Sequence, residues 1–210
     1  VNNLKLLVND INCMTKAIEI GELRKRSDAT RHDGEYRRIM EGINESVDRI
    51  VGFIDEVPTP VVVINNNHEI KFINKTGAEI MGFSSEQLVG SKCYDSFKTL
   101  HCKTDKCAST QAMIQNCNIS SETVAYPDGK EMEIAYAAVP VKDSDGIIVG
   151  AMEVITDQTE IKRAQKVAIK QADYQDRQVQ TLITNLAKLA KGELDIEMFV
   201  EEADADTREI

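Results

Sequence analysis

The sequence predicts a central α+β domain, a five-stranded antiparallel sheet with helices on one face, flanked by helical segments that form a parallel dimeric bundle. Two observations lead to this prediction. Apolar residues recur at heptad spacing near both ends of the chain, whereas the middle contains short alternating runs separated by turn residues. We therefore divide the chain into residues 1–57, 58–157 and 158–210.

The N-terminal segment contains two amphipathic helical patterns joined by a polar connector. The connector lies between Gly21 and Gly34 and is too long for a tight helical hairpin, so it can run back along the bundle and let both helices point the same way. Two helices alone cannot bury both apolar stripes, and a second copy of the chain would complete a parallel homodimer. The stripes consist of Leu4, Leu7, Ile11, Met14 and Ile18, and of Tyr36, Met40, Ile43, Val47, Ile50, Ile54 and Val57.

The middle segment changes from helical to strand-like periodicity. Pro58 and Pro60 end the second helix, and Asn74 suits the N-cap of a helix that stops at Gly82. Turn sequences at Pro127-Asp128-Gly129 and Asp143-Ser144-Asp145-Gly146 predict hairpins. The five predicted strands cover residues 61–65, 69–73, 119–126, 130–141 and 147–156.

The C-terminal segment has a third apolar stripe, which is weak and polar at first and strong from Val179 onward. Small and polar residues in a helical seam reduce the free-energy difference between alternative packings of the helix, so this helix is suited to switching between them. Gly-Glu-Leu follows an apolar helix twice, at Gly21 to Leu23 and at Gly192 to Leu194, where Gly fits the helix C-cap and Leu can pack back. The stripe comprises Ile161, Gln165, Ala168, Ala172, Gln175, Val179, Leu182, Leu186 and Leu189.

Composition and motifs exclude several classes of function. The net charge is −10 without a Lys/Arg stripe, which argues against nucleic acid as a partner, and no apolar run approaches the roughly 18 residues that span a bilayer. We therefore expect no membrane contact by these residues. Five cysteines indicate a reducing compartment. Phosphate-binding loops and Ser-His-Asp arrangements are missing, so we expect no enzymatic activity, and His32 and His68 are expected to be solvated.

The middle segment resembles a PAS sensor domain over roughly residues 57–160. The resemblance implies a five-stranded sheet with a ligand pocket between sheet and helices. It also implies that Asp157 and Thr159 belong to a signature that connects the domain to an exit helix, which either residue could cap. The matching residues are Asn65, Asn66, Glu69, Ile70, Ile73, Asn74, Gly82, Phe83, Glu86, Leu88, Gly90, Asp128, Gly129, Gly146, Gly150, Asp157, Gln158 and Thr159.

The flanking segments resemble HAMP modules, with a connector that carries Gly-x-Leu and with Gly34-Glu35 opening the second helix. Together with a PAS domain, the stretch YQDRQVQTLITNLAKLAKGEL is similar to prokaryotic methyl-accepting chemotaxis receptors. This resemblance implies a signal-relaying parallel homodimer with a chemotaxis kinase and a coupling protein as partners. It also implies that the chain is a cytoplasmic portion of a receptor, while membrane anchoring elsewhere stays open. A histidine-kinase sensory region or a plain dimerisation scaffold with an empty PAS domain are the alternatives.

The cysteine-rich stretch is the candidate ligand, redox or metal site. Cys93, Cys102, Cys107 and Cys117 are separated by eight, four and nine residues, and His101 is adjacent to Cys102. Four soft ligands could hold zinc or an iron–sulfur cluster, although a Cys-x-x-Cys pair is missing. A reversible Cys102–Cys107 disulfide and a purely structural role are the other interpretations.

The cofactor, if there is one, is unknown. Gly90-Ser91-Lys92-Cys93 has the spacing of the flavin-adduct motif, but Lys92, Tyr94 and Asp95 replace the residues that contact flavin in that family. A Cys-x-x-Cys-His haem motif is also missing. We therefore expect neither flavin nor haem.

Overall fold

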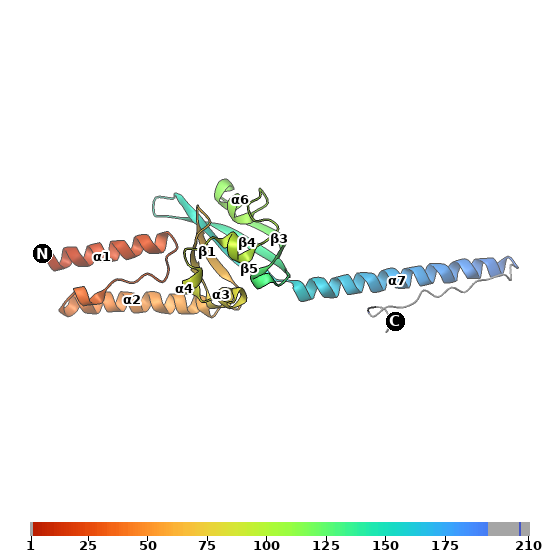
Figure 1. The fold of residues 1–210 in the computed structure, drawn as a ribbon, viewed down its shortest axis with the longest axis horizontal. Coiled ribbons are helices and arrows are strands. Elements are labelled where there is room, and N and C mark those ends of the chain that lie inside the picture. The colour runs from red at the N-terminus through yellow and green to blue at the C-terminus, as the bar shows by residue number, and fades with distance from the viewer. Residues whose placement is uncertain (1, 193–205, 207–210) are drawn as a thin grey trace. The chain divides into compact units, whose positions relative to one another are not determined.

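The computed structural model describes residues 2–192 and 206, which belong to two compact units, Val1–Gln158 and Thr159–Ile210. Each unit is described by itself. The first contains α1 (Asn2–Glu19), a 3-10 turn (Ala29–Arg31), α2 (Gly34–Asp55), β1 (Val61–Asn65), β2 (Ile70–Ile73), α3 (Lys75–Met81), α4 (Ser85–Leu88), α5 (Cys93–Phe97), α6 (Ala108–Gln115), β3 (Ile119–Ala125), a second 3-10 turn (Pro127–Gly129), β4 (Met132–Lys142) and β5 (Ile148–Asp157). The second contains α7 (Thr159–Ala190) (Figure 1).

The five strands form one antiparallel sheet in the order β2-β1-β5-β4-β3. This confirms the predicted sheet, and each strand end lies within two residues of its expected position. The first and last strands in sequence are neighbours, because β1 pairs with β5 from Val61↔Val154 to Asn65↔Gly150. The first strand of the sheet along the chain, β1, is thus hydrogen-bonded to the last strand, β5.

Asn74 does more than cap a helix. Its side-chain oxygen accepts the Gly77 N–H at 3.0 Å, as predicted, and also the Val61 N–H at 2.9 Å. Its amide nitrogen donates to the Thr59 carbonyl at 2.9 Å. The helix ends at Gly82, whose φ of +73° is in the left-handed region that favours glycine. Asn74 therefore joins α3 to the start of the sheet.

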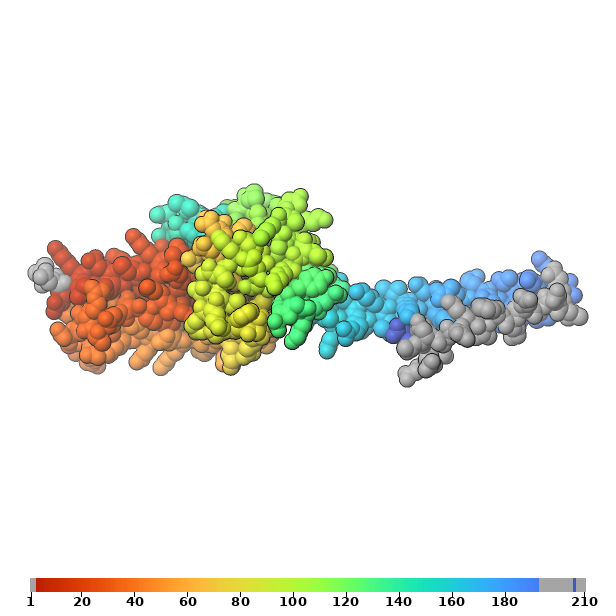
Figure 2. Space-filling model, viewed as in Figure 1, coloured from red at the N-terminus to blue at the C-terminus, as the bar shows by residue number. Residues whose placement is uncertain are grey.

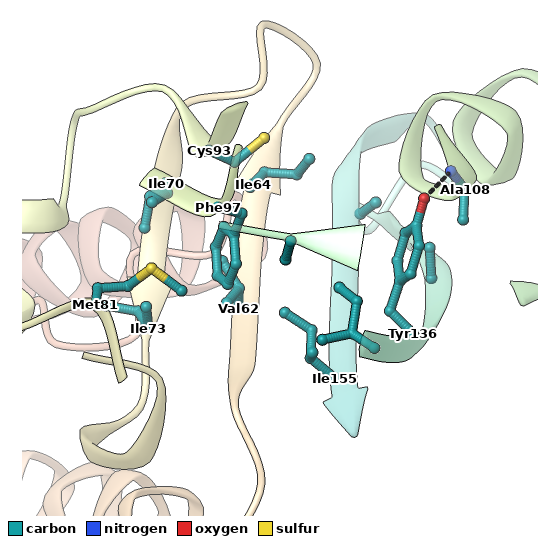
Figure 3. Packing of buried hydrophobic residues seen from close by; sticks show 14 of the residues in the cluster. Val62, Ile64, Ile70, Ile73, Met81, Cys93, Phe97, Ala108, Tyr136 and Ile155 are labelled. Atoms are coloured by element: carbon teal, nitrogen blue, oxygen red, sulfur yellow. Dashed lines mark hydrogen bonds between the residues drawn. The ribbon is translucent and has the colours of Figure 1, made fainter. Parts of the chain in front are cut away.

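One face of the sheet, here called the inner face, packs against α3 to α6. The inner-face residues of β1, β4 and β5 meet residues of these short helices in a single apolar core (Figure 3). Small side chains line much of it, so the helices approach the sheet closely. The core comprises Val62, Ile64, Ile70, Ile73, Ala78, Met81, Leu88, Cys93, Phe97, Ala108, Ala112, Ala125, Ile134, Tyr136, Ala138, Ala151 and Ile155.

The other face, here called the outer face, is covered at β1 and β2 by the C-terminal half of α2. Val51 of α2 packs on Val63 and Phe72. The expectation of helices on one face is therefore confirmed for the helices within the predicted domain, α3 to α6. α2, which was assigned to the N-terminal segment, covers part of the opposite face. The continuous apolar run of β1 agrees with this arrangement, because a strand buried on both faces loses the alternation of polar and apolar residues.

α1 and α2 lie side by side and point in the same direction, with the connector running back between their ends (Figure 1). The space-filling view shows the two helices packed along each other (Figure 2). Ser27 of the connector joins both helices: its hydroxyl donates to the Asp10 carbonyl at 3.0 Å, and its carbonyl accepts from Asn44 Nδ2 at 2.8 Å. The predicted course of the connector is therefore confirmed.

His32 is buried, so the expectation of a solvated side chain is wrong. Its Nε2 lies 3.0 Å from Asp10 Oδ2, while Arg31 Nη1 donates to Asp10 Oδ1 at 2.9 Å. Asp10 lies three residues after Leu7 and four before Met14, on the same buried side of α1. Counting only apolar residues overlooked this carboxylate, which gives the histidine a partner inside the helix pair.

α7 forms a second unit, in which every described residue from Thr159 to Ala190 has a solvent-accessible side chain in a single copy of the chain. The large residues of its predicted apolar stripe, among them Val179, Leu182 and Leu186, are exposed. Gly192 follows the helix with a φ of +84°, as its predicted capping role requires, whereas Leu194 lies outside the described residues. Within the described ranges, every helix is too short or too polar to cross a membrane.

Candidate functional site

A buried carboxyl group lies on the inner face of the sheet. Glu153 of β5 alternates with Ala151 and Ile155, so the strand turns all three side chains into the core. Ser109 of α6 donates its hydroxyl hydrogen to Glu153 Oε1. Burial raises the pKa of the Glu153 carboxyl, and the hydrogen bond from Ser109 partly offsets this rise. This hydrogen bond thus holds the first turn of α6 to β5.

Tyr136 makes a second polar contact between the sheet and α6. Its hydroxyl oxygen accepts the Ala108 N–H at 3.2 Å (Figure 3). Burial raises the pKa of Tyr136 to about 12, so the hydroxyl stays protonated at neutral pH. Thr123 on the neighbouring strand is also buried, and its hydroxyl has no hydrogen-bond partner among the described residues.

The structure brings three of the predicted site cysteines to one end of this core. Cys93 is the first residue of α5 and is buried, Cys107 immediately precedes α6, and Cys102 lies in the loop between these helices. Burial raises the pKa of the Cys93 thiol, and the nearby Glu153 carboxyl and the Cys107 and Cys102 thiols add to the rise. Cys117 follows α6 and is exposed, so it does not join the group.

The metal interpretation finds no support in this geometry. Among residues 2–192 and 206, no three His, Cys, Asp or Glu side chains are close enough together to hold a metal ion. All five cysteines are free thiols. The three clustered cysteines are therefore available for thiol chemistry or for packing.

His101 attaches the cysteine loop to β3. Its Nδ1 lies 3.2 Å from the Ser121 hydroxyl, and the adjacent Leu100 N–H donates to the Val124 carbonyl at 3.1 Å. His68 is half-buried rather than solvated and contacts the Thr110 hydroxyl of α6 through Nε2 at 2.9 Å. Burial, assisted by the Lys92 charge, lowers the pKa of His68 and favours the neutral ring.

A second candidate site lies where the connector meets the outer face. Gly21 ends α1 with a φ of +88°, and a Cβ at this position would lie 2.5 Å from Val63 Cγ1 of β1. Leu23 packs beside it on the apolar cluster of Val51, Val63 and Phe72. Only glycine fits this approach, so the predicted coupling residues Gly21 and Leu23 contact the sheet directly.

Arg24 continues this contact with polar interactions. Its guanidinium forms a bidentate ion pair with Asp55 at the end of α2, with distances of 3.0 and 2.7 Å, and lies 5.1 Å from the centre of the Phe72 ring. Asp55 Oδ1 also accepts the Lys75 N–H at 3.1 Å. Gly21, Leu23, Arg24 and Asp55 are here called the input junction, which links the connector, α2 and α3.

The other two predicted coupling residues in the N-terminal segment lie elsewhere. Gly34 and Glu35 open α2, about 30 Å along the helix from Asp55. Glu35 pairs with Arg38 at 3.0 Å on an exposed surface. They start the helix as predicted, but they are not part of the input junction.

Comparison with known families identifies the central domain. A family model described as the PAS fold matches residues 54–163, just over half of the chain. The chain belongs to the PAS fold family. The matched region includes the buried polar core, the strands β1 and β2 that the input junction contacts, and Asp55 of the junction itself.

Solved PAS structures are similar at low sequence identity. The PAS domain of a protein from Colwellia psychrerythraea is 20% identical with a TM-score of 0.48, covering 54% of this chain and 98% of that one. The PAS domain of an HTR-like protein from Haloarcula marismortui is 14% identical with a TM-score of 0.47, covering 58% and 98%. The Vibrio cholerae VqmA dimer solved in the absence of target DNA is 15% identical with a TM-score of 0.47. That match covers 54% of this chain, which spans about half of VqmA (53%). Curated proteins gave no match.

The exit of the PAS domain follows directly from β5. Asp157 is the last residue of that strand and pairs with Ile134, and the Gln158 N–H donates to the Glu133 carbonyl at 2.8 Å. α7 begins at Thr159. The predicted exit signature therefore lies where the chain passes from strand to helix.

Proposed function

We propose that this chain is the signal relay of a methyl-accepting chemotaxis receptor, in which a PAS domain passes conformational changes between two HAMP modules. The observation that carries the proposal is the input junction, where Gly21 and Arg24 attach the connector to the outer face of the sheet. The parallel course of α1 and α2 supports the HAMP interpretation of residues 1–57.

The sheet offers a short path from input to output. A displacement of α1 acts through Gly21 on Val63 of β1, and β1 is hydrogen-bonded along its whole length to β5. β5 ends at Asp157, and the chain continues into α7. The weak seam of α7 around Ala168 and Ala172 then provides a helix that can change its packing at low cost.

A parallel homodimer accounts for the exposed apolar residues. In a single copy, α1, α2 and α7 each leave large apolar side chains in contact with solvent. A second copy would cover them by pairing equivalent helices. These residues include Leu4, Val8, Ile39, Ile50, Phe53, Val179, Leu182, Leu186 and Leu189.

Sedimentation velocity tests the dimer. Phe53 is 75% exposed on α2, and Phe53→Asp should weaken the dimer by about tenfold or more, since burial of a Phe side chain contributes about 2 kcal/mol. Phe83→Asp is the matched control, because Phe83 is also exposed but lies outside the helix pair. A monomeric wild-type chain, or an equal effect of both substitutions, would contradict a dimer that forms through α2.

Asp157→Ala in the full-length receptor tests the relay. The variant should fold but lose control of the associated kinase, whereas Asp145→Ala, in an exposed turn, should signal normally. Kinase control that is unchanged in the Asp157→Ala receptor would overturn the proposal.

We also propose that the chain has no enzymatic activity and functions in the cytoplasm. ATP-dependent phosphorylation of the receptor chain itself would instead assign it to a sensor histidine kinase, and a stimulus-independent helix packing would indicate a scaffold.

A further inference from the structure

The loop between α5 and α6 is compact and holds two half-buried cysteines, Cys102 and Cys107. Three backbone hydrogen bonds fold it into successive turns: Cys102 to Thr99 at 3.1 Å, Thr104 to His101 at 3.2 Å, and Cys107 to Thr104 at 3.3 Å. Each such turn keeps Cα atoms three residues apart within about 7 Å. Both thiols thus belong to one small folded segment at the edge of the core.

The surroundings of the five thiols single out this pair. Cys93 is buried and its raised pKa keeps it protonated, which makes it a poor nucleophile. Cys13 lies in α1, and Cys117 lies beyond the far end of α6, about 12 Å along that helix from Cys107. Cys102 is held in place, because its sulfur contacts the Thr99 N–H and hydroxyl, both at 3.2 Å.

The first residues of α6 connect this loop to β4 and β5. Cys107 directly precedes Ala108, whose N–H bonds Tyr136 of β4, and Ser109, whose hydroxyl bonds Glu153 of β5. Glu153 lies four residues before Asp157. A change of geometry at Cys107 therefore acts on the two polar contacts that hold α6 to the output side of the sheet.

We propose that Cys102 and Cys107 are a dithiol–disulfide pair that senses peroxide-class oxidants and reports its redox state through α6. Hydrogen peroxide oxidises one thiol to a sulfenic acid and leaves as water. The second thiol then attacks that sulfur, forming the disulfide and releasing a second water. A dithiol reductant reverses the reaction by supplying two electrons and two protons. The bond fixes the two Cα atoms within about 7 Å of each other and so constrains the first turn of α6.

Peptide mapping after peroxide treatment of the reduced protein tests the chemistry. Trypsin cleaves after Lys103 and Lys106, between the two cysteines, so a Cys102–Cys107 disulfide appears as two linked peptides with the loss of two hydrogens. We expect this link in the wild type and in Cys117→Ser, and its loss in Cys102→Ser and in Cys107→Ser. Circular dichroism checks that each variant is folded. A dominant link through Cys13, Cys93 or Cys117, or free thiols after treatment, would overturn the pair.

Hydrogen exchange of the oxidised and reduced protein tests the sensing role, which rests on the proposed function. Disulfide formation should change the exchange rates of the α6 and β5 amides, and the change should disappear in Cys107→Ser. If the disulfide forms but the exchange rates of the α6 and β5 amides do not change, the sensing role is overturned, whereas the proposed thiol chemistry stands. The two hypotheses fail separately, because a receptor in which Asp157→Ala signals normally would disprove the relay without affecting the disulfide.

Discussion

The two faces of the sheet differ in what they bury. The inner face carries a continuous apolar core with one buried carboxyl group and three cysteines at its end, closed by α3 to α6. Among the described residues, α2 and the connector cover the outer face over β1 and β2, and Val141 of β4 and Met152 of β5 pack against the edge of the same cluster. The other half of this face forms an open hollow of about 450 Å³ lined chiefly by small residues such as Ala135, Ala137 and Thr156.

In the proposed relay, this difference separates the sensing face from the transmitting face. The buried carboxyl group and the clustered cysteines lie on the inner face, whereas the contacts of the N-terminal helices and connector with the sheet lie on the outer face. Because neighbouring residues of a strand point to opposite faces, β1 and β5 contact both environments at once. A change on either face can therefore reach the same output strand.

The largest expected effect comes from closing the space at the input junction. Gly21→Ala should lower the free energy of unfolding by about 1–2 kcal/mol from the left-handed backbone and by about 1–3 kcal/mol more from the collision with Val63. Gly90→Ala is the matched control, because Gly90 has the same φ of +88° but open space around it. Urea unfolding measures both variants. Equal losses would show that Gly21 is needed only for its backbone conformation.

On the inner face, Ser109→Ala should lower the free energy of unfolding by about 1–3 kcal/mol, because the buried Glu153 carboxyl loses its donor. Ser120→Ala, at an exposed position of β3, provides the control and should have little effect. Chemical denaturation at pH 7 compares the two variants. If Ser109→Ala leaves the free energy of unfolding unchanged, the α6–β5 contact contributes little to the stability of the fold.

The protonation of Glu153 predicts a pH dependence with a definite sign. Its folded pKa is raised above the ordinary value of 4.5, so above that pH the unfolded chain releases a proton that the folded chain keeps. Wild-type stability should therefore fall with rising pH by up to about 1.4 kcal/mol per unit until the folded pKa is passed. Glu153→Gln should remove this slope, whereas Glu131→Gln, at an exposed site, should keep it. Parallel slopes in both variants would contradict the assignment.

The smallest expected effect concerns the ion pair of the input junction. A double-mutant cycle on Arg24 and Asp55 should give a coupling energy of about 1 kcal/mol, because the pair is bidentate and partly buried. The exposed Arg38–Glu35 pair is the control and should give about 0.3 kcal/mol. Similar values for both pairs would mean that Arg24 adds no stability to the junction.

Local sequence patterns predicted the parts of the fold that depend on neighbouring residues. The Asn74 cap, the Gly21 helix end and the five strands were all found in this way. The pairing of Arg24 with Asp55 could not be predicted from local patterns, because the two residues are 31 positions apart and meet only after folding. Glu153 had a usable signal, since it alternates with Ala151 and Ile155, but a lone acid in a strand is also common at the surface.

The cysteine spacing illustrates the same limit. The three intervals allowed metal, disulfide and structural interpretations, and only the fold places Cys117 away from the other three cysteines. What separates the interpretations is burial and tertiary position, which spacing along the chain does not contain.

Hydrogen exchange of Arg24→Ala tests the relay through the outer face most directly. If the input junction couples the connector to the sheet, the variant should exchange faster than wild type in β1, β2 and the first turn of α3, and Arg38→Ala should not. Faster exchange confined to residues 20–27 would contradict the account, because the connector would then move without the sheet.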